Sequence, residues 1–315
     1  MQWESPYIYR SGVNLMGLTE YNKAMIKALC KCDIREARGW AELSLDEDKT
    51  QKNSEFVKKY KEILTAKKSG AVEIPRELNS IITCENVQET FKENRYYLTA
   101  AQKAIADKIF RMSRVCEQLM EMQIPYKNAT LLYGPPGTGK TTFGKYIAYK
   151  LGLPFCYLNF SKVVDSYMGA TSKNISQAFM FASTTPCVFM LDEVDAISIN
   201  RAKGNSGSDG ELGRVTVTLM QEFDKLENDI VLIAATNRAD MLDPAFISRC
   251  ATKGEMLAFS KDDSIRMVKK FLKDINMDIP DNTITKIVEK NSDQRSVMFD
   301  VVSHIAEMID KGQIE

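Results

Sequence analysis

Apolar positions alternate between strand-like runs and helical spacing through most of the chain after about residue 98. Short apolar runs predict buried strands at 129–133, 155–158, 187–191, 230–235 and 255–259. Between these runs, apolar side chains recur at helical spacing, as over 142–151 and 172–182. Strands that alternate with helices predict an α/β fold, here a three-layer core built on a parallel sheet.

Helical patterns flank this predicted core on both sides. Thr99 and Gln102 have capping-box spacing and open a long predicted helix that leads into the core. After residue 259 the pattern becomes helical and predicts a small C-terminal lid. We therefore expect a mostly helical N-terminal region over 1–97, a core over 98–259 and a helical lid over 260–315.

A glycine-rich loop between a predicted strand and a predicted helix is the first chemical signal. It consists of Gly134, Pro135, Pro136, Gly137, Thr138, Gly139, Lys140, Thr141 and Thr142. The spacing fits G-x-x-x-x-G-K-[ST], in which backbone N–H groups surround phosphates at a helix N-terminus. Lys140 is predicted to reach the β- and γ-phosphates, and Thr141 to offer its hydroxyl to Mg²⁺.

Two carboxylates follow the strand predicted at 187–191. Ligands of open α/β sheets bind at the carboxyl ends of the strands, so Asp192 is placed to hold Mg²⁺. Glu193 is then predicted to orient and deprotonate the water that attacks the nucleotide. The sequence therefore predicts a Mg²⁺-dependent nucleoside triphosphate hydrolase.

Composition narrows the function classes only slightly. The 315 residues include 42 basic and 42 acidic side chains, which disfavours a strongly electrostatic nucleic-acid binder. Neither a secretory signal pattern nor an apolar run of membrane-spanning length is found, so we expect a cytoplasmic protein without membrane contact. The seven cysteines, with a single histidine, are expected to be reduced core residues rather than zinc ligands.

Further motifs distinguish the type of nucleotidase. The N-K-x-D signature of guanine-specific loops is missing from the sequence. Instead, an apolar run leads into Thr236-Asn237-Arg238, and a Ser-Arg-Cys box follows at 248–250. With the phosphate loop and the Asp-Glu pair, these motifs resemble the AAA+ ATPases over about residues 98–315.

The resemblance implies a role for several polar residues. Asn237 corresponds to sensor 1, which contacts the γ-phosphate or the attacking water. Arg249 corresponds to the arginine finger that reaches the ATP of a neighbouring subunit, with no useful target in its own. Asn159 corresponds to a regulatory residue that restrains the catalytic glutamate, and Arg295 to sensor 2. The Ser-Arg-Cys box is similar to that of clamp loaders, whereas unfoldases usually carry two arginines.

The segment Ser166-Tyr167-Met168-Gly169 resembles the pore loop of AAA+ unfoldases. In that family an aromatic and a hydrophobic side chain before glycine, here Tyr167 and Met168 before Gly169, grip an extended polypeptide. The glycine- and serine-rich segment 201–210 is either a second pore loop or a surface loop.

The resemblance favours an ATP-driven motor that remodels, unfolds or threads a protein substrate through an oligomeric ring. It implies ATP and Mg²⁺ as cofactors, a homo-oligomer that we expect to be a hexamer, and a chaperone-like action on proteins. The region 1–97 is expected to recruit the substrate or an adaptor. Two alternatives are a DNA-linked loader or helper ATPase, which the Ser-Arg-Cys box favours, and a nucleotide-dependent switch or scaffold with slow turnover.

Overall fold

The computed structural model describes residues 18–30, 34–65, 74–160, 163, 171–197, 209–227 and 229–311. The chain divides into two compact units, Met1–Lys67 and Lys68–Glu315. In the first unit the described elements are α1 (Glu20–Cys30), α2 (Ile34–Glu47), a short 3₁₀ helix at Gln51–Asn53 and α3 (Ser54–Thr65). All three α-helices fall within the region 1–97 that the sequence predicts to be mostly helical.

A six-stranded sheet forms the centre of the larger unit. Its strands are β1 (Ile82–Glu85), β2 (Asn128–Tyr133), β3 (Phe155–Asn159), β4 (Val188–Asp192), β5 (Val231–Thr236) and β6 (Thr252–Glu255). Their order across the sheet is β1-β3-β4-β5-β2-β6. All neighbouring pairs are parallel except β1 and β3. This confirms the predicted α/β fold with a parallel sheet.

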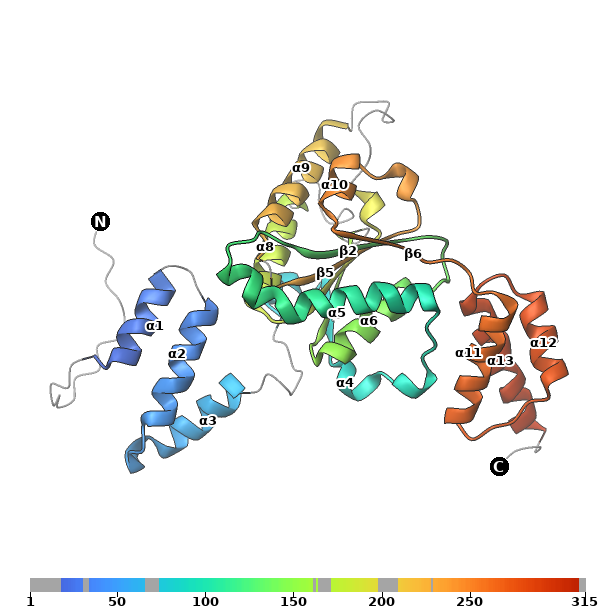
Figure 1. Cartoon of the computed structure of the whole chain (residues 1–315), viewed down its shortest axis with the longest axis horizontal. Coiled ribbons are helices and arrows are strands. Elements are labelled where there is room, and N and C mark those ends of the chain that lie inside the picture. Colours follow the sequence, from blue (N-terminus) through green and yellow to red (C-terminus); the bar gives the residue numbers. More distant parts are fainter. Residues whose placement is uncertain are drawn as a thin grey trace. The chain divides into compact units, whose positions relative to one another are not determined.

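Nine α-helices within the described ranges surround this sheet or follow it. They are α4 (Val87–Thr90), α5 (Ala100–Glu121), α6 (Lys140–Leu151), α8 (Thr171–Thr184), α9 (Asp209–Lys225), α10 (Pro244–Arg249), α11 (Lys261–Asp274), α12 (Asp281–Lys290) and α13 (Gln294–Asp310). The helices α5 and α6 cover one face of the sheet, and α8 and α9 cover the other (Figure 1). None of these helices is both long and apolar enough to span a membrane.

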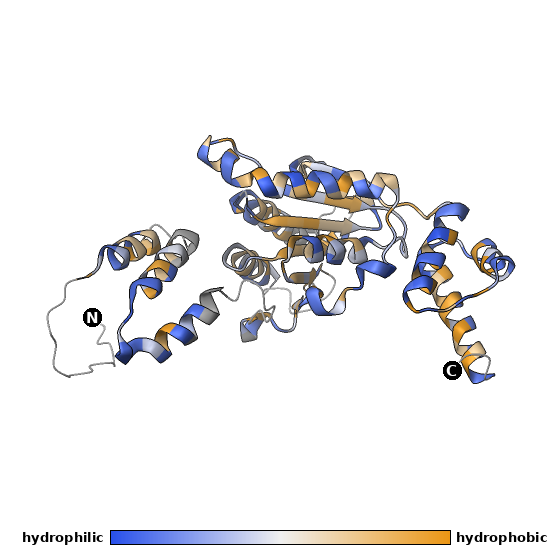
Figure 2. Cartoon of the chain, turned by 60° about the horizontal axis from the view of Figure 1, so that its bottom comes forward, coloured by the Kyte–Doolittle hydropathy of each residue, from blue (hydrophilic) through white to orange (hydrophobic). Residues whose placement is uncertain are grey.

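Each central strand packs on both faces, which explains its continuous apolar run. In β5, Ile233 contacts the core under α5 and α6, whereas Leu232 and Ala234 contact the core under α8 and α9. Figure 2 shows these strands as hydrophobic segments between helices of mixed character. The successive side chains of a strand point to opposite faces, so a strand covered on both sides needs apolar residues at every position.

The helix boundaries follow from capping. The side chain of Thr99 accepts from the N–H of Gln102, and the Gln102 side chain accepts from the N–H of Thr99, so the predicted capping box is present. Ser260 caps α11 by accepting from the N–H of Asp263. The lid helices α11 to α13 bury their own apolar cluster, which includes Val268, Ile284 and Val301.

Two predicted boundaries differ from the structure. The last strand is Thr252–Glu255 rather than 255–259, because it is the segment up to Glu255 that pairs with β2. Residues 82–85, which lie in the expected N-terminal region, form β1 at the edge of the sheet. The segment 74–97 therefore belongs to the larger unit rather than to a separate N-terminal part.

A disulfide joins Cys84 of β1 to Cys156 of β3. The expectation that all cysteines are reduced is therefore wrong for this pair. The antiparallel register sets Cys84 opposite Cys156, with Cα atoms 4.2 Å apart. This is the spacing of a non-hydrogen-bonded pair, in which the side chains are close together. The pairing of β1 with β3 brings the two cysteines together, and β1 was not predicted from the sequence.

Candidate active site

The glycine-rich loop connects β2 to α6, as its motif requires. Gly134 has φ +145°, and a Cβ atom there would lie 2.2 Å from the carbonyl oxygen of Met256. Glycine is needed here because the segment that follows β6 passes directly beside the loop. Lys140 is buried and donates to the carbonyl oxygens of Gly134 at 2.7 Å and Pro135 at 2.8 Å. The loop is thus closed around the lysine at the N-terminus of α6.

The lid approaches the same loop at Gly137. This glycine has φ +83°, and a Cβ atom there would lie 2.3 Å from Oδ1 of Asp293. Asp293 caps α13 by accepting from the N–H groups of Arg295 and Ser296. The N-terminus of α13 therefore lies against the phosphate loop, which brings core and lid together at the predicted nucleotide site.

The two predicted metal ligands also meet. Thr141, the second residue of α6, donates from Oγ1 to Oδ2 of Asp192 at 3.3 Å. The other carboxylate oxygen of Asp192 accepts from the N–H of Glu193 at 2.9 Å. A hydroxyl and a carboxylate from different elements are therefore in contact at the carboxyl end of β4.

This donor set fits a magnesium ion. Mg²⁺ prefers oxygen ligands and usually takes only one or two from the protein, the rest coming from phosphate and water. Thr141 and Asp192 supply a hydroxyl and a carboxylate. Among the described residues, no cluster of three histidine, cysteine or acidic side chains suited to a metal is found.

Burial changes the protonation equilibria of both charged groups in this site. Desolvation lowers the pKa of Lys140, and the positive charge of Arg295 lowers it further against the opposing effect of Asp192. Desolvation raises the pKa of Asp192. Buried charges are costly unless compensated, so a polyphosphate that meets Lys140 and a divalent cation that meets Asp192 would each relieve this cost.

Glu193 has an unusual backbone conformation. Its φ is +56°, in the left-handed region, and its carbonyl oxygen accepts from the N–H of Ala196 in a short 3₁₀ helix at Val194–Ala196. Such a conformation in a residue other than glycine costs of order 1 kcal/mol or more and concentrates at functional sites. It turns the chain immediately after Asp192.

Asn237 directly follows β5, and β5 is the neighbour of β4 in the sheet. Its side chain is exposed at the same edge as Asp192 and Glu193. The preceding Thr236 donates to Asp195 at 2.6 Å, which ties the end of β5 to the segment after Glu193. The contact of Asn237 with a γ-phosphate, expected of sensor 1, stays a prediction.

Arg249 forms an ion pair within its own chain. Its Nε and Nη2 donate to the two carboxylate oxygens of Asp224 at 2.9 and 2.8 Å. Its Nη1 also donates to the carbonyl oxygen of Ala245 at 3.0 Å. The fork of the guanidinium matches the carboxylate geometry, and the same property would suit phosphate oxygens.

Asn159 and Arg295 were assigned regulatory and nucleotide-sensing roles. Arg295, in the first turn of α13, is exposed and close enough to influence the pKa of Lys140. Asn159 ends β3 beside Asp192, its partner in the parallel register. Its amide donates to the hydroxyl of Tyr157 at 3.3 Å. The expected pore-loop residues Tyr167, Met168 and Gly169, and the segment 201–208, lie outside the described residues.

Three residues of this region were not identified from the sequence. Tyr157 donates to Asp192 at 3.0 Å, Asp195 accepts from Thr236, and Asp224 holds Arg249. Burial and the charge of Asp192 raise the pKa of Tyr157 to about 12, so its hydroxyl is a donor at neutral pH. Only Tyr157 had a local signal, because strand alternation places it on the same face as Asn159.

Comparison with known proteins agrees with this architecture. Residues 130–256 match the family described as ATPase family associated with various cellular activities (AAA). An uncharacterized AAA family ATPase, y4kL, of Sinorhizobium fredii is 30% identical over 244 residues, which cover 75% of this chain and 72% of that protein. The chain belongs to the AAA family, and it is an ATP-hydrolysing enzyme with a P-loop.

Other relatives match a shorter stretch, and the chain spans less than a third of their length. A proteasome-activating nucleotidase of Methanococcus maripaludis is 39% identical over 120 residues, 37% of this chain and 30% of that protein. The 26S proteasome subunit RPT4 of Saccharomyces cerevisiae is 40% identical over 120 residues and is covered to 28%. The crystal structure of the FIGL-1 AAA domain in complex with ADP has the same fold, with a TM-score of 0.53 at 21% identity, covering 70% of this chain and 74% of that one.

Proposed function

We propose that this ATPase is a Mg²⁺-dependent motor that assembles into a ring and uses ATP hydrolysis to remodel or thread a protein substrate. The observation that carries the chemical half is the contact of Thr141 with Asp192, which joins the phosphate loop to the strand end that bears Glu193. The similarity of the core to proteasome-activating nucleotidases supports a protein as the substrate.

The residues divide the reaction between them as follows. Lys140 and the N–H groups at the start of α6 bind the phosphates, because they form a positive, hydrogen-bonding helix terminus. Thr141 and Asp192 hold the metal, which neutralises the charge that develops on the phosphates. Glu193 orients the attacking water and accepts its proton, while Asn237 positions the γ-phosphate or that water. Arg295 senses the nucleotide from the lid.

Arg249 serves the neighbouring subunit in this proposal. It lies at the end of α10 and is partly exposed, so its guanidinium is accessible to a second chain. To reach another subunit's ATP it exchanges the carboxylate of Asp224 for phosphate oxygens, which have similar geometry. The N-terminal region recruits the substrate or an adaptor, and Tyr167 and Met168 grip the polypeptide.

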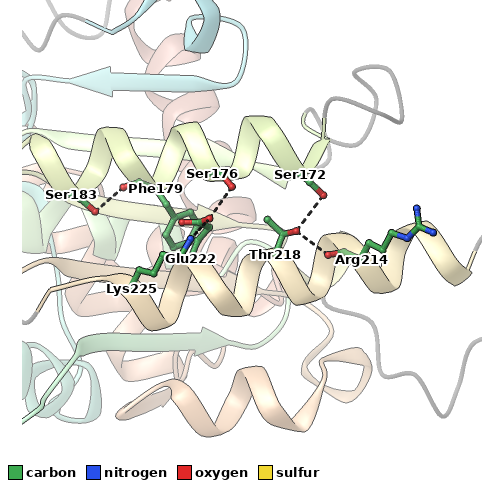
Figure 3. A network of polar contacts seen from close by, with 8 residues as sticks. All are labelled: Ser172, Ser176, Phe179, Ser183, Arg214, Thr218, Glu222 and Lys225. Atoms are coloured by element: carbon green, nitrogen blue, oxygen red, sulfur yellow. Dashed lines mark hydrogen bonds and ion pairs between the residues drawn. The ribbon is translucent and has the colours of Figure 1, made fainter.

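Two helices would transmit the nucleotide state to the substrate loops. The helix α8 begins two residues after Gly169, and α9 begins at the end of the segment 201–208. Figure 3 shows two polar contacts between these helices, together with others that lie within a single helix. Ser176 and Lys225 both donate to Glu222 at 2.9 Å, and Thr218 donates to Ser172 at 3.3 Å. These contacts join the first turns of α8 to the second half of α9, so a shift of α8 would be passed to α9.

The test is ATP hydrolysis measured against protein concentration for the wild type and Arg249→Ala. The proposal expects the rate per subunit to rise with concentration. Arg249→Ala should lose about 10³-fold in rate while it still binds ATP, since a finger supplied in trans acts on the transition state. Glu193→Gln, which should bind ATP without hydrolysing it, allows the assembly mass to be measured in ATP.

A concentration-independent rate, with Glu193→Gln monomeric in ATP, would contradict the ring. The substrate half has a separate test in Tyr167→Ala, which should abolish remodelling of an unfolded model protein and retain ATP hydrolysis. Tyr149→Ala, on α6, is the control for loss of an aromatic side chain elsewhere. If Tyr167→Ala remodels as well as the wild type, the pore-loop assignment is wrong.

A further inference from the structure

Tyr157 lies beside the metal-binding carboxylate, in a position that none of the recognised motifs includes. It is on β3, which runs parallel to β4 and pairs Asn159 with Asp192. Its hydroxyl donates to Oδ2 of Asp192 at 3.0 Å. The amide of Asn159 donates to the same hydroxyl oxygen at 3.3 Å. The three side chains form a chain of hydrogen bonds from the end of β3 to the end of β4.

We propose that Tyr157 is a positioning residue for the binding of the magnesium-bound nucleotide. Its hydroxyl holds the carboxylate of Asp192 in the orientation that coordinates the metal, and it links this carboxylate to Asn159. The proposal rests on the proposed role of Asp192 as a metal ligand. Asn159 then acts on the metal site through Tyr157 and Asp192, in addition to any effect on Glu193.

The need for this contact follows from the way Asp192 is held. Its Oδ1 accepts from the N–H of Glu193 at 2.9 Å, whereas its Oδ2 accepts from Thr141 at 3.3 Å and from Tyr157 at 3.0 Å. The bond from Thr141 is the longest of the three, so on the Oδ2 side Tyr157 is the closer donor. A carboxylate held by donors on both oxygens has its plane defined, whereas one held on a single oxygen can rotate.

The geometry also explains why a tyrosine stands at a strand position. Side chains two residues apart on a strand share a face, so Tyr157 and Asn159 point to the same side of the sheet. An aromatic side chain is long enough to reach the carboxylate at the end of the neighbouring strand. The ring of Tyr157 is half-buried, with the ring of Phe155 6.3 Å away. Phenylalanine at 157 would keep this ring and remove only the hydroxyl.

The experiment compares ATP binding with and without the metal. The reference protein carries Glu193→Gln alone, which prevents turnover, and Tyr157→Phe, Asn159→Ala and the double variant are prepared in this same background. Titration calorimetry then measures ATP affinity in excess Mg²⁺ and in EDTA. The control is Tyr149→Phe, which removes a hydroxyl at the far end of α6, away from Asp192.

The proposal expects Tyr157→Phe to weaken binding about 10-fold in Mg²⁺, the usual order for losing a hydrogen bond to a metal ligand, and to leave affinity in EDTA unchanged. Asn159→Ala should weaken Mg²⁺-dependent binding when Tyr157 is present and have no further effect in Tyr157→Phe. That non-additivity is the signature of residues that act through one another. Tyr149→Phe should match the reference protein in both conditions.

Other outcomes overturn the proposal in distinguishable ways. Equal Mg²⁺-dependent affinity in Tyr157→Phe and the reference protein would overturn the positioning role and leave the metal site intact. An equal loss in Mg²⁺ and in EDTA would show that the hydroxyl supports the fold rather than the metal. If the reference protein itself binds ATP equally well in both conditions, the proposed metal site fails and the inference fails with it.

Discussion

At the scale of single residues, the side chain of Asp293 restricts which residue the phosphate loop can have at position 137. Alanine there would adopt a left-handed φ and bring its Cβ within 2.3 Å of Asp293. The backbone cost is about 1–2 kcal/mol. Relief requires the loop to move, and its N–H groups then no longer face the phosphates. We expect Gly137→Ala to lower ADP affinity at least about 10-fold, as measured by calorimetry.

Gly152 provides the matched control for this prediction. It ends α6 with φ +68°, also left-handed, but no atom lies within 4 Å of a Cβ built there. Gly152→Ala should therefore cost about 1 kcal/mol of stability and leave ADP affinity unchanged. Equal affinity losses in the two variants would mean that backbone strain alone, and not the contact with Asp293, controls the loop.

At the scale of elements, α10 depends on its surroundings. It has only six residues, too few to be stable alone. Asp243 caps it, and Phe246 is fully buried with its ring 5.8 Å from that of Phe223 on α9. We expect Phe246→Ala to reduce the free energy of unfolding by about 3–5 kcal/mol in urea denaturation.

A substitution on the exposed face of α10 serves as the control for Phe246→Ala. Ser248 bonds to the carbonyl oxygen of Ala245 at the exposed surface of the same helix. Ser248→Ala should change the free energy of unfolding by less than about 0.5 kcal/mol. If Phe246→Ala is equally mild, the helix that carries Arg249 is not held by its aromatic contact with α9.

The edge strand β1 depends on a covalent link as well as on pairing. It has four residues, and the disulfide to Cys156 closes a separation of 72 residues. Reduction should lower the free energy of unfolding by about 2–4 kcal/mol, because the reduced unfolded chain gains entropy. Alkylation of the denatured, unreduced protein followed by peptide mass spectrometry should leave Cys84 and Cys156 unmodified. Their alkylation would show that the pair is not bonded, and Cys187, buried and free, is the internal reference.

At the scale of the whole molecule, the division after Lys67 predicts that the larger unit is self-sufficient. All the described residues of the candidate active site lie within Lys68–Glu315. A protein that comprises residues 68–315 should unfold cooperatively and bind ADP with the affinity of the full chain, as measured by thermal unfolding with and without ADP. A fragment that is unfolded, or that fails to bind ADP, would show that the first unit completes the fold. A truncation at residue 98 is the informative contrast, because it also removes β1 and its pairing with β3.

The local sequence by itself determined the alternation of strands and helices, the capped start of α5, the phosphate-binding loop and the pair Asp192 and Glu193 after a buried strand. These features depend on side-chain periodicity and on consecutive residues, both of which are written in short segments. The order of the strands, the position of β1, the disulfide and the contacts of Tyr157 with Asp192 and of Asp224 with Arg249 were decided only by the tertiary structure. Each of these joins residues 25 or more positions apart, as the separations of 35 for Tyr157 and Asp192 and 25 for Asp224 and Arg249 illustrate. Such pairs are set by how the elements pack against one another, and no local pattern records that packing.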